Sequence, residues 1–317
     1  MVKILILGGA GFIGSNLARA LVDRGDRPRI FTRPSFDISN LEDILDHVDL
    51  VYGDFMDDVA VRNATKGVDI VFHLISTTFP SMTIESSVYD LLSNLLPTIR
   101  LVEICISNGI KKIIYASSGG TIYGEPNTIP VREDHPLIPK SAYGQSKLTI
   151  ENYLSFYARS TDLDIDILRT SNPYGPRQNP FGVQGIVGVA MKCAFFDNIL
   201  KIYGIGENVR DYLYIDDVIN AMLIASEMPG SHIVNISSGK GHSIIDIVRM
   251  IEEISGRVIR KEFVPNRQGD VVVNILSNEL ARETYGWVPK VDMQEGLSKT
   301  WDWINHRLRH QQKGFPL

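Results

Sequence analysis

Short apolar runs alternate with longer helical patterns along the first half of the chain. Apolar runs predict strands at residues 2–7, 29–32, 50–53, 69–74, 111–117 and 165–169. Helical periodicity predicts helices at residues 15–24, 87–108 and 143–160. Strands separated by helices form βαβ units, and strands that are apolar throughout are buried on both faces. The pattern therefore predicts an α/β fold, a doubly wound parallel sheet of the Rossmann type.

The pattern loosens after residue 170, where prolines and glycines interrupt it up to Gly188. Residues 211–228 and 232–237 then resemble one more helix and strand, which could rejoin the sheet. We expect a dinucleotide-binding domain in residues 1–170, rejoined by about 211–237. A smaller C-terminal substrate-binding lobe should comprise residues 171–210 and 238–317.

The composition of the chain indicates which classes of protein it can belong to. The chain has 317 residues, a hydrophobic fraction of 44% and a formal net charge of -5, which is typical of a globular protein and argues against a nucleic-acid partner. Cys105 and Cys193 lie in apolar, helix-like contexts outside any Cys-x-x-Cys pair, so we expect neither a disulfide nor a metal site. No segment reaches the roughly 18 apolar residues that a membrane-spanning helix needs. We therefore expect a cytoplasmic protein without membrane insertion.

A glycine-rich turn follows the first predicted strand. Gly8, Gly11 and Gly14 lie between that strand and the helix predicted at residues 15–24, and Phe12 and Ile13 belong to the same turn. Glycines let the backbone approach a pyrophosphate, and the helix N-terminus supplies N–H groups and a favourable dipole. The turn predicts a binding site for NAD or NADP.

The end of the second strand bears on which dinucleotide binds. Proteins that bind NAD usually have a carboxylate at this position, which holds the adenosine ribose, but this chain has Thr32. The neighbouring Arg33 could pair with the 2′-phosphate of NADP. This favours NADP, although Arg33 could equally be a solvated side chain. Gly53 and Phe55 flank Asp54, which we expect to accept the exocyclic amine of the adenine.

Tyr143 and Lys147 form a Tyr-x-x-x-Lys motif on a predicted helix, where positions four apart share a face. A neighbouring ammonium favours the phenolate and should lower the pKa of the phenol, so that Tyr143 can exchange a proton with a sugar hydroxyl. Lys147 would also hold the nicotinamide ribose. The alternative is a pair on the helix surface without function. Hydroxyls at the end of the preceding strand, residues 117–124, can orient the reacting oxygen.

These landmarks resemble the extended short-chain dehydrogenase/reductase (NAD-dependent epimerase/dehydratase) family, and within it the branch similar to UDP-glucose 4-epimerase. The resemblance covers nearly the whole chain. It includes Asn94, the Asn172-Pro-Tyr-Gly175 segment, and Arg210-Asp-Tyr.

The resemblance also implies roles for individual residues. Asn172 would contact the sugar or its diphosphate, Arg210 and Arg267 would hold the diphosphate, and Asp270 would orient Arg267 or bind the nucleotide ribose. Further cofactor contacts are expected at Leu74, Ser76, Asn94 and Ser117. Further substrate contacts are expected at Thr78, Ser118, Gly119 and Gln184, and residues such as Pro80, Thr170 and Ser171 would help to select the sugar.

One departure from the family pattern concerns the catalytic hydroxyl. Many relatives carry Ser or Thr at the third position of the Ser-Ser-x motif, where this chain has Gly119. Ser118 or Thr121 would serve instead. The dehydratase branch carries Asp-Glu after its catalytic Thr, whereas the chain has Gly120 and Thr121 there, which argues against dehydration.

The leading hypothesis is a nucleotide-sugar 4-epimerase for a UDP-hexose or UDP-N-acetylhexosamine, acting through a 4-keto sugar with a tightly bound cofactor. The alternative is an NADPH-dependent reductase of nucleotide-linked 4-keto sugars, and a third possibility is a catalytically inactive dinucleotide sensor. The resemblance also implies a homodimer, joined through the helices at residues 87–108 and 143–160.

Overall fold

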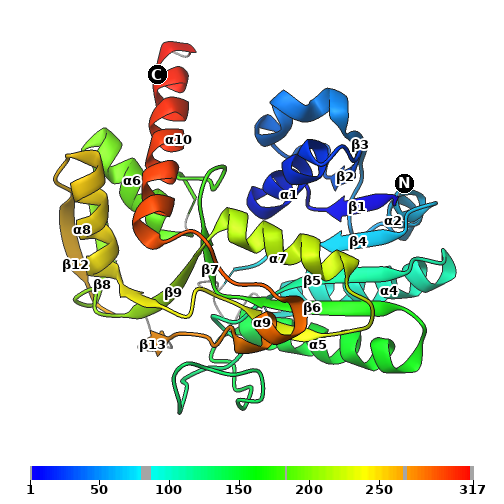
Figure 1. Cartoon of the computed structure of the whole chain (residues 1–317). Coiled ribbons are helices and arrows are strands. Elements are labelled where there is room, and N and C mark those ends of the chain that lie inside the picture. The colour runs from blue at the N-terminus through cyan, green and yellow to red at the C-terminus, as the bar shows by residue number, and fades with distance from the viewer. Residues whose placement is uncertain (1, 80–86, 183, 267–269, 315–317) are drawn as a thin grey trace.

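The computed structural model describes residues 2–79, 87–182, 184–266 and 270–314. Within this part of the chain, a sheet of seven parallel strands forms the centre, in the order β10-β6-β5-β4-β1-β2-β3 (Figure 1). The strands are β1 (Ile4–Leu7), β2 (Arg29–Thr32), β3 (Asp49–Tyr52), β4 (Ile70–His73), β5 (Lys112–Ser118), β6 (Asp164–Thr170) and β10 (Ile233–Ile236). The order reverses between β1 and β4, so the predicted doubly wound sheet is confirmed.

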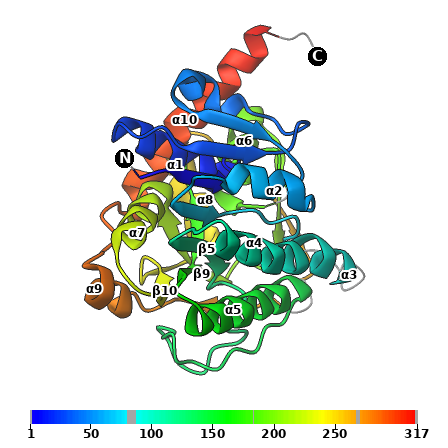
Figure 2. The same cartoon turned by 90° about the vertical axis from the view of Figure 1, so that its right-hand side faces the viewer.

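Helices cover both faces of this sheet (Figure 2). On one face lie α2 (Asp58–Thr65), α4 (Leu96–Ser107) and α5 (Ala142–Ser160), and on the other lie α1 (Phe12–Asp23) and α7 (Ile215–Glu227). The alternation of side chains along a strand explains this arrangement. In β1, Leu5 and Leu7 join the hydrophobic cluster under α4 and α5, whereas Ile4 and Ile6 join the cluster under α1 and α7.

The remaining elements form a smaller lobe beside the carboxyl ends of the strands. Strand β9 (Val209–Tyr214) pairs with β7 (Asn172–Tyr174), β11 (Gly241–Ser243) and β13 (Val273–Asn274). A two-stranded sheet joins β8 (Ile199–Tyr203) to β12 (Arg260–Val264). The helices of this lobe are α6 (Ile186–Phe196), α8 (Ile244–Ser255) and α10 (Met293–Gly314). Helix α9 (Glu279–Tyr285) packs instead against β10 and α7 of the central sheet.

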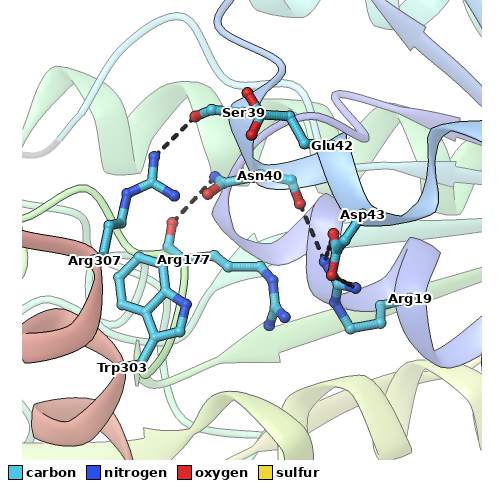
Figure 3. Close-up of a pocket in the computed structure, with 8 residues that line it drawn as sticks. All are labelled: Arg19, Ser39, Asn40, Glu42, Asp43, Arg177, Trp303 and Arg307. Atoms are coloured by element: carbon cyan, nitrogen blue, oxygen red, sulfur yellow. Dashed lines mark hydrogen bonds and ion pairs between the residues drawn. The ribbon is translucent and has the colours of Figure 1, made fainter. Parts of the chain in front are cut away.

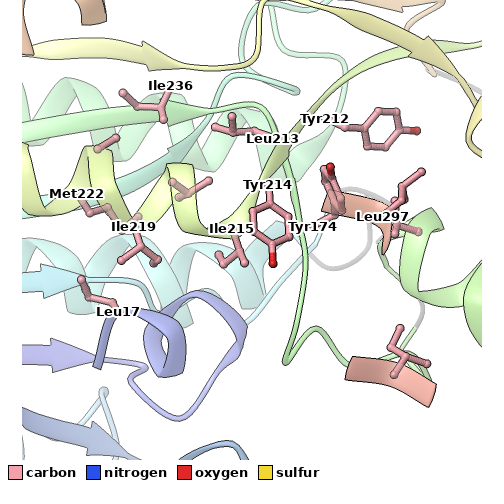
Figure 4. Packing of buried hydrophobic residues seen from close by; sticks show 14 of the residues in the cluster. Leu17, Tyr174, Tyr212, Leu213, Tyr214, Ile215, Ile219, Met222, Ile236 and Leu297 are labelled. Carbon is pink, nitrogen blue, oxygen red and sulfur yellow. The ribbon is translucent and has the colours of Figure 1, made fainter. Parts of the chain in front are cut away.

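One hydrophobic cluster runs from the α1 and α7 face of the sheet into this lobe. Leu17, Ile219 and Met222 lie at its sheet end, while Tyr214 and Leu297 lie at its lobe end (Figure 4). Buried apolar residues of α8 and α10 belong to the same cluster. The lobe therefore shares its core with the sheet.

Most predicted elements agree with the structure to within two or three residues. The predicted helix at 211–228 is wrong at its start, because residues up to Tyr214 belong to β9 and α7 begins at Ile215. The segment Asp-Tyr-Leu-Tyr is rich in strand-forming residues, and Asp216 and Asp217 supply the acidic first turn that favours the start of a helix there.

The predicted helix at 87–108 is divided. It consists of α3 (Ser87–Asp90), a π-helical turn η3 (Leu91–Leu95) and α4. Pro97 has no N–H to bond back to residue 93, so the ladder shifts and Leu96 N–H donates to Leu91 C=O instead. The 3₁₀ helix η1 (Ser39–His47) and α2 were not predicted. No helix in the described ranges is both long and apolar enough to span a membrane.

Candidate active site

The glycine turn predicted to hold a dinucleotide connects β1 to α1 at the carboxyl edge of the sheet. Gly8 has a φ of 81° and its N–H donates to Phe31 C=O at 3.0 Å. A Cβ atom at Gly14 would lie 2.4 Å from the Gly8 carbonyl oxygen, so the close approach of helix and turn requires glycine there.

The first turn of α1 has the chemistry of an anion site. Gly11 is the N-cap residue, and no side chain caps this end of the helix. The N–H groups of Phe12 and Ile13 therefore lack a side-chain acceptor, and the positive end of the helix dipole adds to their attraction for a phosphate. The turn fits the pyrophosphate of a dinucleotide.

The residues predicted to hold the adenosine lie at the ends of β2 and β3. Thr32 is buried and Arg33, directly after it, is exposed. The carboxylate of Asp54 accepts a hydrogen bond from Met56 N–H at 2.9 Å. Phe55 is buried, with its ring 5.0 Å from the ring of His73. Both predicted regions thus lie beside the glycine turn, since Gly8 N–H donates to Phe31 C=O at the end of β2 and Gly53 N–H donates to Thr32 C=O, each at 3.0 Å.

Helix α5 carries the predicted catalytic pair. Ser141 caps its N-terminus by accepting a hydrogen bond from Gly144 N–H, so the helix starts at Ala142, one residue before Tyr143. Lys147 is buried; its Nζ donates to Ala116 C=O at 2.9 Å and lies 4.7 Å from the centre of the Tyr115 ring. The distance from Nζ to the centre of the Tyr143 ring is 5.7 Å. The two side chains therefore face the end of β5 together.

The pKa values of this pair differ from the sequence-based expectation. Burial raises the pKa of Tyr143 to about 12, while hydrogen bonding to the hydroxyls of Ser118 and Ser76 acts in the opposite direction. Burial also lowers the pKa of Lys147 to about 8. We expected the Lys147 ammonium to lower the pKa of Tyr143, and this is not observed. Desolvation dominates in this enclosed site, and the ammonium donates its hydrogen bond to the Ala116 carbonyl.

The end of β5 explains why the chain has glycine at position 119. A Cβ atom there would lie 2.3 Å from Leu276 Cδ1 and 3.0 Å from the Arg169 carbonyl oxygen, so no serine or threonine fits without displacement. Ser118 takes the position beside the Tyr143 phenol. The Thr121 hydroxyl donates to Ser118 C=O at 3.4 Å. The sequence left Ser118 and Thr121 as alternatives, and the structure puts Ser118 next to Tyr143.

The loop after β4 meets the π-helical turn beside Tyr143. Asn94 accepts from Thr77 N–H at 3.0 Å and donates to the hydroxyls of Thr77 and Thr78. The Ser76 hydroxyl donates to Thr78 C=O at 3.0 Å. Leu74 lies just before them, with its N–H bonded to Leu7 C=O. Of these residues, Ser76, Thr78 and Asn94 line one small pocket with Tyr143 and Lys147.

Sequence reasoning missed three residues of this region: His73, Asp90 and Tyr115. Asp90 and Tyr115 line the same pocket as the catalytic pair. Tyr115 and His73 are fully buried and occur in apolar strands, where nothing in the pattern distinguishes them from core residues. Asp90 had a weak signal, since it is an acidic residue within an apolar helical pattern.

A buried charged network lies beneath the pair. The Glu151 carboxylate accepts from the guanidinium of Arg169 at 2.8 Å and from the Ser117 hydroxyl. Arg169 also donates to the Tyr123 hydroxyl at 3.0 Å. The Ser117 side chain, predicted to contact the cofactor, is thus engaged by Glu151, and the network ties α5 to β5 and β6.

The remaining predicted substrate residues lie at the end of β6 and in the smaller lobe. Asn172 donates to Asp211 C=O at 2.8 Å, and Thr170 and Ser171 are buried at the end of β6. The guanidinium of Arg210 donates to Val272 C=O at 3.3 Å. Burial lowers the pKa of this arginine, and the nearby Tyr212 and exposed Asp270 act in the opposite direction. Gln184 is exposed ahead of α6. Pro80 and Arg267 lie outside the described residues.

A second cavity, of about 190 Å³, opens between η1 and α10 (Figure 3). Its three arginines have partners: Arg19 pairs with Asp43, Arg177 donates to Asn16 at 2.7 Å, and Arg307 donates to the Ser39 hydroxyl at 2.8 Å. Asn40 also donates to Arg177 C=O. These bonds join the cofactor-side elements to the smaller lobe.

Comparisons with known proteins agree with this geometry. Residues 4–237 match the model of the NAD dependent epimerase/dehydratase family. The chain is 33% identical over 310 residues to a UDP-glucose 4-epimerase of Mycolicibacterium smegmatis (96% of this chain, 99% of the relative). It is 33% identical over 314 residues to a dTDP-4-dehydro-6-deoxyglucose reductase of Escherichia coli (93% and 95%).

A solved structure is equally similar. The UDP-glucose 4-epimerase of Thermus thermophilus, in complex with NAD, superposes with a TM-score of 0.89 at 32% identity and covers 96% of this chain and 99% of its own. Sequence, fold and the glycine turn beside a Tyr-x-x-x-Lys helix therefore lead to one conclusion. The chain belongs to the NAD-dependent epimerase/dehydratase family.

Proposed function

We propose that the protein is a nucleotide-sugar 4-epimerase that acts on a UDP-hexose or UDP-N-acetylhexosamine. The observation that carries the proposal is the position of Tyr143, which lines one pocket with Lys147 and Ser76 at the end of β5, two strands from the glycine turn that follows β1. The epimerases of M. smegmatis and T. thermophilus, which align along nearly their whole length, support it.

In this mechanism Tyr143 exchanges a proton with the 4-hydroxyl of the sugar. Ser118 orients that hydroxyl, and Lys147 supplies positive charge while holding the nicotinamide ribose. A bound nicotinamide dinucleotide supplies the reversible redox chemistry at carbon 4. Tyr143 takes this proton in its phenolate form and returns it as a phenol after the 4-keto sugar has rotated in the site, so one residue serves both directions. Thr121, close to Ser118, is the second candidate for the orienting hydroxyl.

The cofactor is NAD or NADP, held by the first turn of α1. The contacts are expected from Gly8, Gly11, Phe12, Ile13 and Gly14, with Asp54, Phe55, Leu74, Ser76, Asn94 and Ser117 at the adenosine and nicotinamide ends. The NAD complex of the T. thermophilus enzyme supports NAD, whereas buried Thr32 followed by exposed Arg33 supports NADP. Affinities for both dinucleotides, measured with Arg33→Ala alongside the wild type, decide between them.

We propose that residues 1–170 and 211–237 hold the cofactor and that residues 171–210 and 238–317 hold the nucleotide sugar. Arginine forks suit a diphosphate, which supports Arg210 as its ligand together with Arg267. Asp270 lies near enough to influence Arg210 electrostatically. The sugar itself would meet Thr78, Gly119, Asn172 and Gln184.

A proton NMR time course tests the function. The purified protein is incubated with UDP-glucose, UDP-N-acetylglucosamine or UDP-glucuronic acid, each with catalytic NAD or NADP. We expect the matching galacto-epimer to accumulate over many turnovers per cofactor. Unchanged spectra with all three sugars would overturn the proposal.

Tyr143→Phe should reduce this turnover by about 100-fold to 10,000-fold, because the variant removes the acid–base group but keeps the ring. Tyr157→Phe is the matched control, since it removes a phenol from the same helix, where it bonds to exposed Glu103. Equal turnover by wild type and Tyr143→Phe would exclude the tyrosine as the catalytic group.

A second candidate function is the reduction of a nucleotide-linked 4-keto sugar by NADPH. The similarity to the E. coli reductase and the Thr32–Arg33 pair favour it. It requires the same tyrosine and lysine. Loss of NADPH absorbance in proportion to a 4-keto substrate, with no epimerisation in the NMR assay, would identify this activity.

We also propose a homodimer joined through α3, η3, α4 and α5. Apolar side chains stand exposed along these helices: Val88, Tyr89, Leu91, Leu92, Leu96, Tyr153 and Phe156. Contiguous apolar surface of this kind is typical of protein interfaces. Light scattering should give the mass of a dimer for the wild type and of a monomer for Leu92→Lys/Phe156→Lys. Val59→Lys, at an exposed apolar position on α2, is the control that should stay dimeric.

A further inference from the structure

Asp90 is a buried carboxylate that the mechanism above does not use. It ends α3, directly before the π-helical turn, and only 3% of its surface is exposed. Helix α3 packs against α5, and Asp90 lines the same pocket as Tyr143 and Lys147. A carboxylate at such depth is costly unless hydrogen bonds or an opposite charge compensate it.

The hydrogen-bond partner of Asp90 is Asn94. The Asn94 amide donates to Asp90 Oδ1 at 2.7 Å and also to the hydroxyls of Thr77 and Thr78, so the carboxylate anchors the amide that holds the loop after β4. An amide does not neutralise a charge. The cation that faces this pocket is Lys147.

Lys147 needs a counter-charge of its own. Its ammonium donates to the carbonyl of Ala116, which carries no formal charge. Glu151 lies one helical turn further along α5, but its carboxylate is engaged by the Arg169 guanidinium and the Ser117 hydroxyl. Asp90 is therefore the acid of this pocket that is not already paired with an arginine or lysine in the described part of the chain.

The groups around the pair come from four elements. They are Asp90 on α3, His73 on β4, Tyr115 on β5, and Glu151 on α5 beside Tyr143 and Lys147. Burial lowers the pKa of Lys147, and Glu151 and then Asp90 act in the opposite direction. Burial raises the pKa of Tyr143, and Asp90 acts in the same direction. Burial lowers the pKa of His73, and Lys147 adds to this lowering. A negative charge at position 90 thus opposes proton loss from both members of the pair.

We propose that Asp90 is a positioning residue of the active site, whose carboxylate serves as counter-ion to the Lys147 ammonium and fixes the orientation of Asn94. The proposal deepens the proposed function and rests on it only in taking Tyr143 and Lys147 as the reacting pair. Asp90 acts through these side chains and does not itself meet the sugar.

The first test measures the ionisation of Tyr143 without substrate or turnover. The protein is labelled with 3-fluorotyrosine, which ionises at lower pH than tyrosine, and the ¹⁹F resonance of residue 143 is assigned by its absence in Tyr143→Phe. Removing the negative charge in Asp90→Asn should lower the midpoint of this titration by about 1 pH unit. Asp90→Glu should stay near the wild type.

Asp58→Asn is the matched control, because it removes the same charge from an exposed position on α2. Its midpoint should equal that of the wild type. An Asp90→Asn protein that is folded by circular dichroism but has the wild-type midpoint would overturn the proposal. If Asp90→Asn does not fold, Asp90→Ser is compared with Asp90→Glu: a lower midpoint in the serine variant alone supports the counter-ion role, and equal midpoints refute it.

The second test uses turnover. In the pH profile of kcat/KM, Asp90→Asn should shift both the acid and the alkaline limb to lower pH, because the lost charge stabilised the protonated form of both groups. A purely structural role would lower the profile without moving its limbs. A protein that shows the ¹⁹F shift but epimerises no sugar would contradict the proposed function and leave the role of Asp90 intact.

Discussion

A methyl group at position 119 would meet both a side chain and the backbone. The Cβ atom of Gly119→Ala would lie 2.3 Å from Leu276 Cδ1 and 3.0 Å from the Arg169 carbonyl oxygen. Leu276 can rotate away, but the carbonyl belongs to β6 and cannot. We expect the variant to lose about 1–3 kcal/mol of unfolding free energy in urea, as overpacked sites do. Gly120→Ala is the control, because its Cβ would come no closer than 3.7 Å to Asn172; equal losses in both variants would contradict the explanation.

His73 makes the fold sensitive to acid. Its ring is fully buried between Phe55 and Tyr115, and its Nε2 shares a hydrogen bond of 2.8 Å with the Thr98 hydroxyl. Burial, with a smaller contribution from Lys147, lowers the pKa of His73 from 6.5 to about 3. The unfolded chain therefore binds this proton first, so stability is complete above pH 6.5 and is lost as the pH falls toward 3.

From pH 7 to pH 5 this single residue should cost the wild type about 2 kcal/mol of unfolding free energy, since one unit of pKa shift corresponds to about 1.4 kcal/mol. His73→Gln, which can keep the bond to Thr98, should show a correspondingly flatter dependence in urea titrations at several pH values. His47→Gln, on the exposed side of η1, is the control. Parallel pH curves for His73→Gln and wild type would exclude His73 as the source.

At the scale of the element, short apolar runs predicted the strands of the sheet because the inner strands are buried along most of their length. The edge strand β3 is partly exposed, but it keeps the apolar pair Leu50 and Val51 at its centre. Two predicted element boundaries were wrong, each for a physical reason. The missing N–H of Pro97 divides a helix whose apolar pattern continues across it. Residues 211–214 form a strand because they pair with β7 and β11, and these partners lie far away in sequence.

The Glu151–Arg169 pair holds α5 against β6, with side chains 2% and 4% exposed. Glu151→Met or Arg169→Met alone should cost about 3–5 kcal/mol, because each leaves a buried charge unpaired. The double variant should cost much less than the sum of the two, measured by urea unfolding. The exposed pair Lys299–Glu295 is the comparison, where about 0.5 kcal/mol is expected. Additive losses in the buried pair would mean that the two charges do not compensate each other.

At the scale of the whole molecule, the sequence led to the glycine turn and the Tyr143–Lys147 pair because their motifs are local. The residues that act across the fold could not be found in this way. Asp90 reaches the pair only because α3 packs on α5, and the restriction at Gly119 comes from Leu276, which is more than 150 positions away. Such contacts depend on the tertiary arrangement and produce no periodic pattern in the sequence.

The shared hydrophobic cluster predicts that the molecule unfolds as one unit. Trp301 and Trp303 lie on α10, whereas the indole N–H of Trp287 donates to Asp217 C=O on α7. In Trp287→Phe the remaining tryptophan fluorescence therefore reports on the smaller lobe, while far-ultraviolet circular dichroism reports on the whole chain. The two unfolding curves in urea should coincide. A fluorescence transition at lower urea concentration would show that the lobe unfolds separately.

The same cluster limits how this scaffold can be recombined. A chimera that takes its smaller lobe from a relative would place foreign side chains against Leu17, Ile219 and Met222, and a seam packed at the density of a protein interior tolerates few changes of volume. Exchange of the loops at the carboxyl edge of the sheet leaves that seam untouched. New sugar preferences should therefore arise in this protein by loop replacement, while transplanted lobes should fail unless the α1 and α7 faces are transplanted with them.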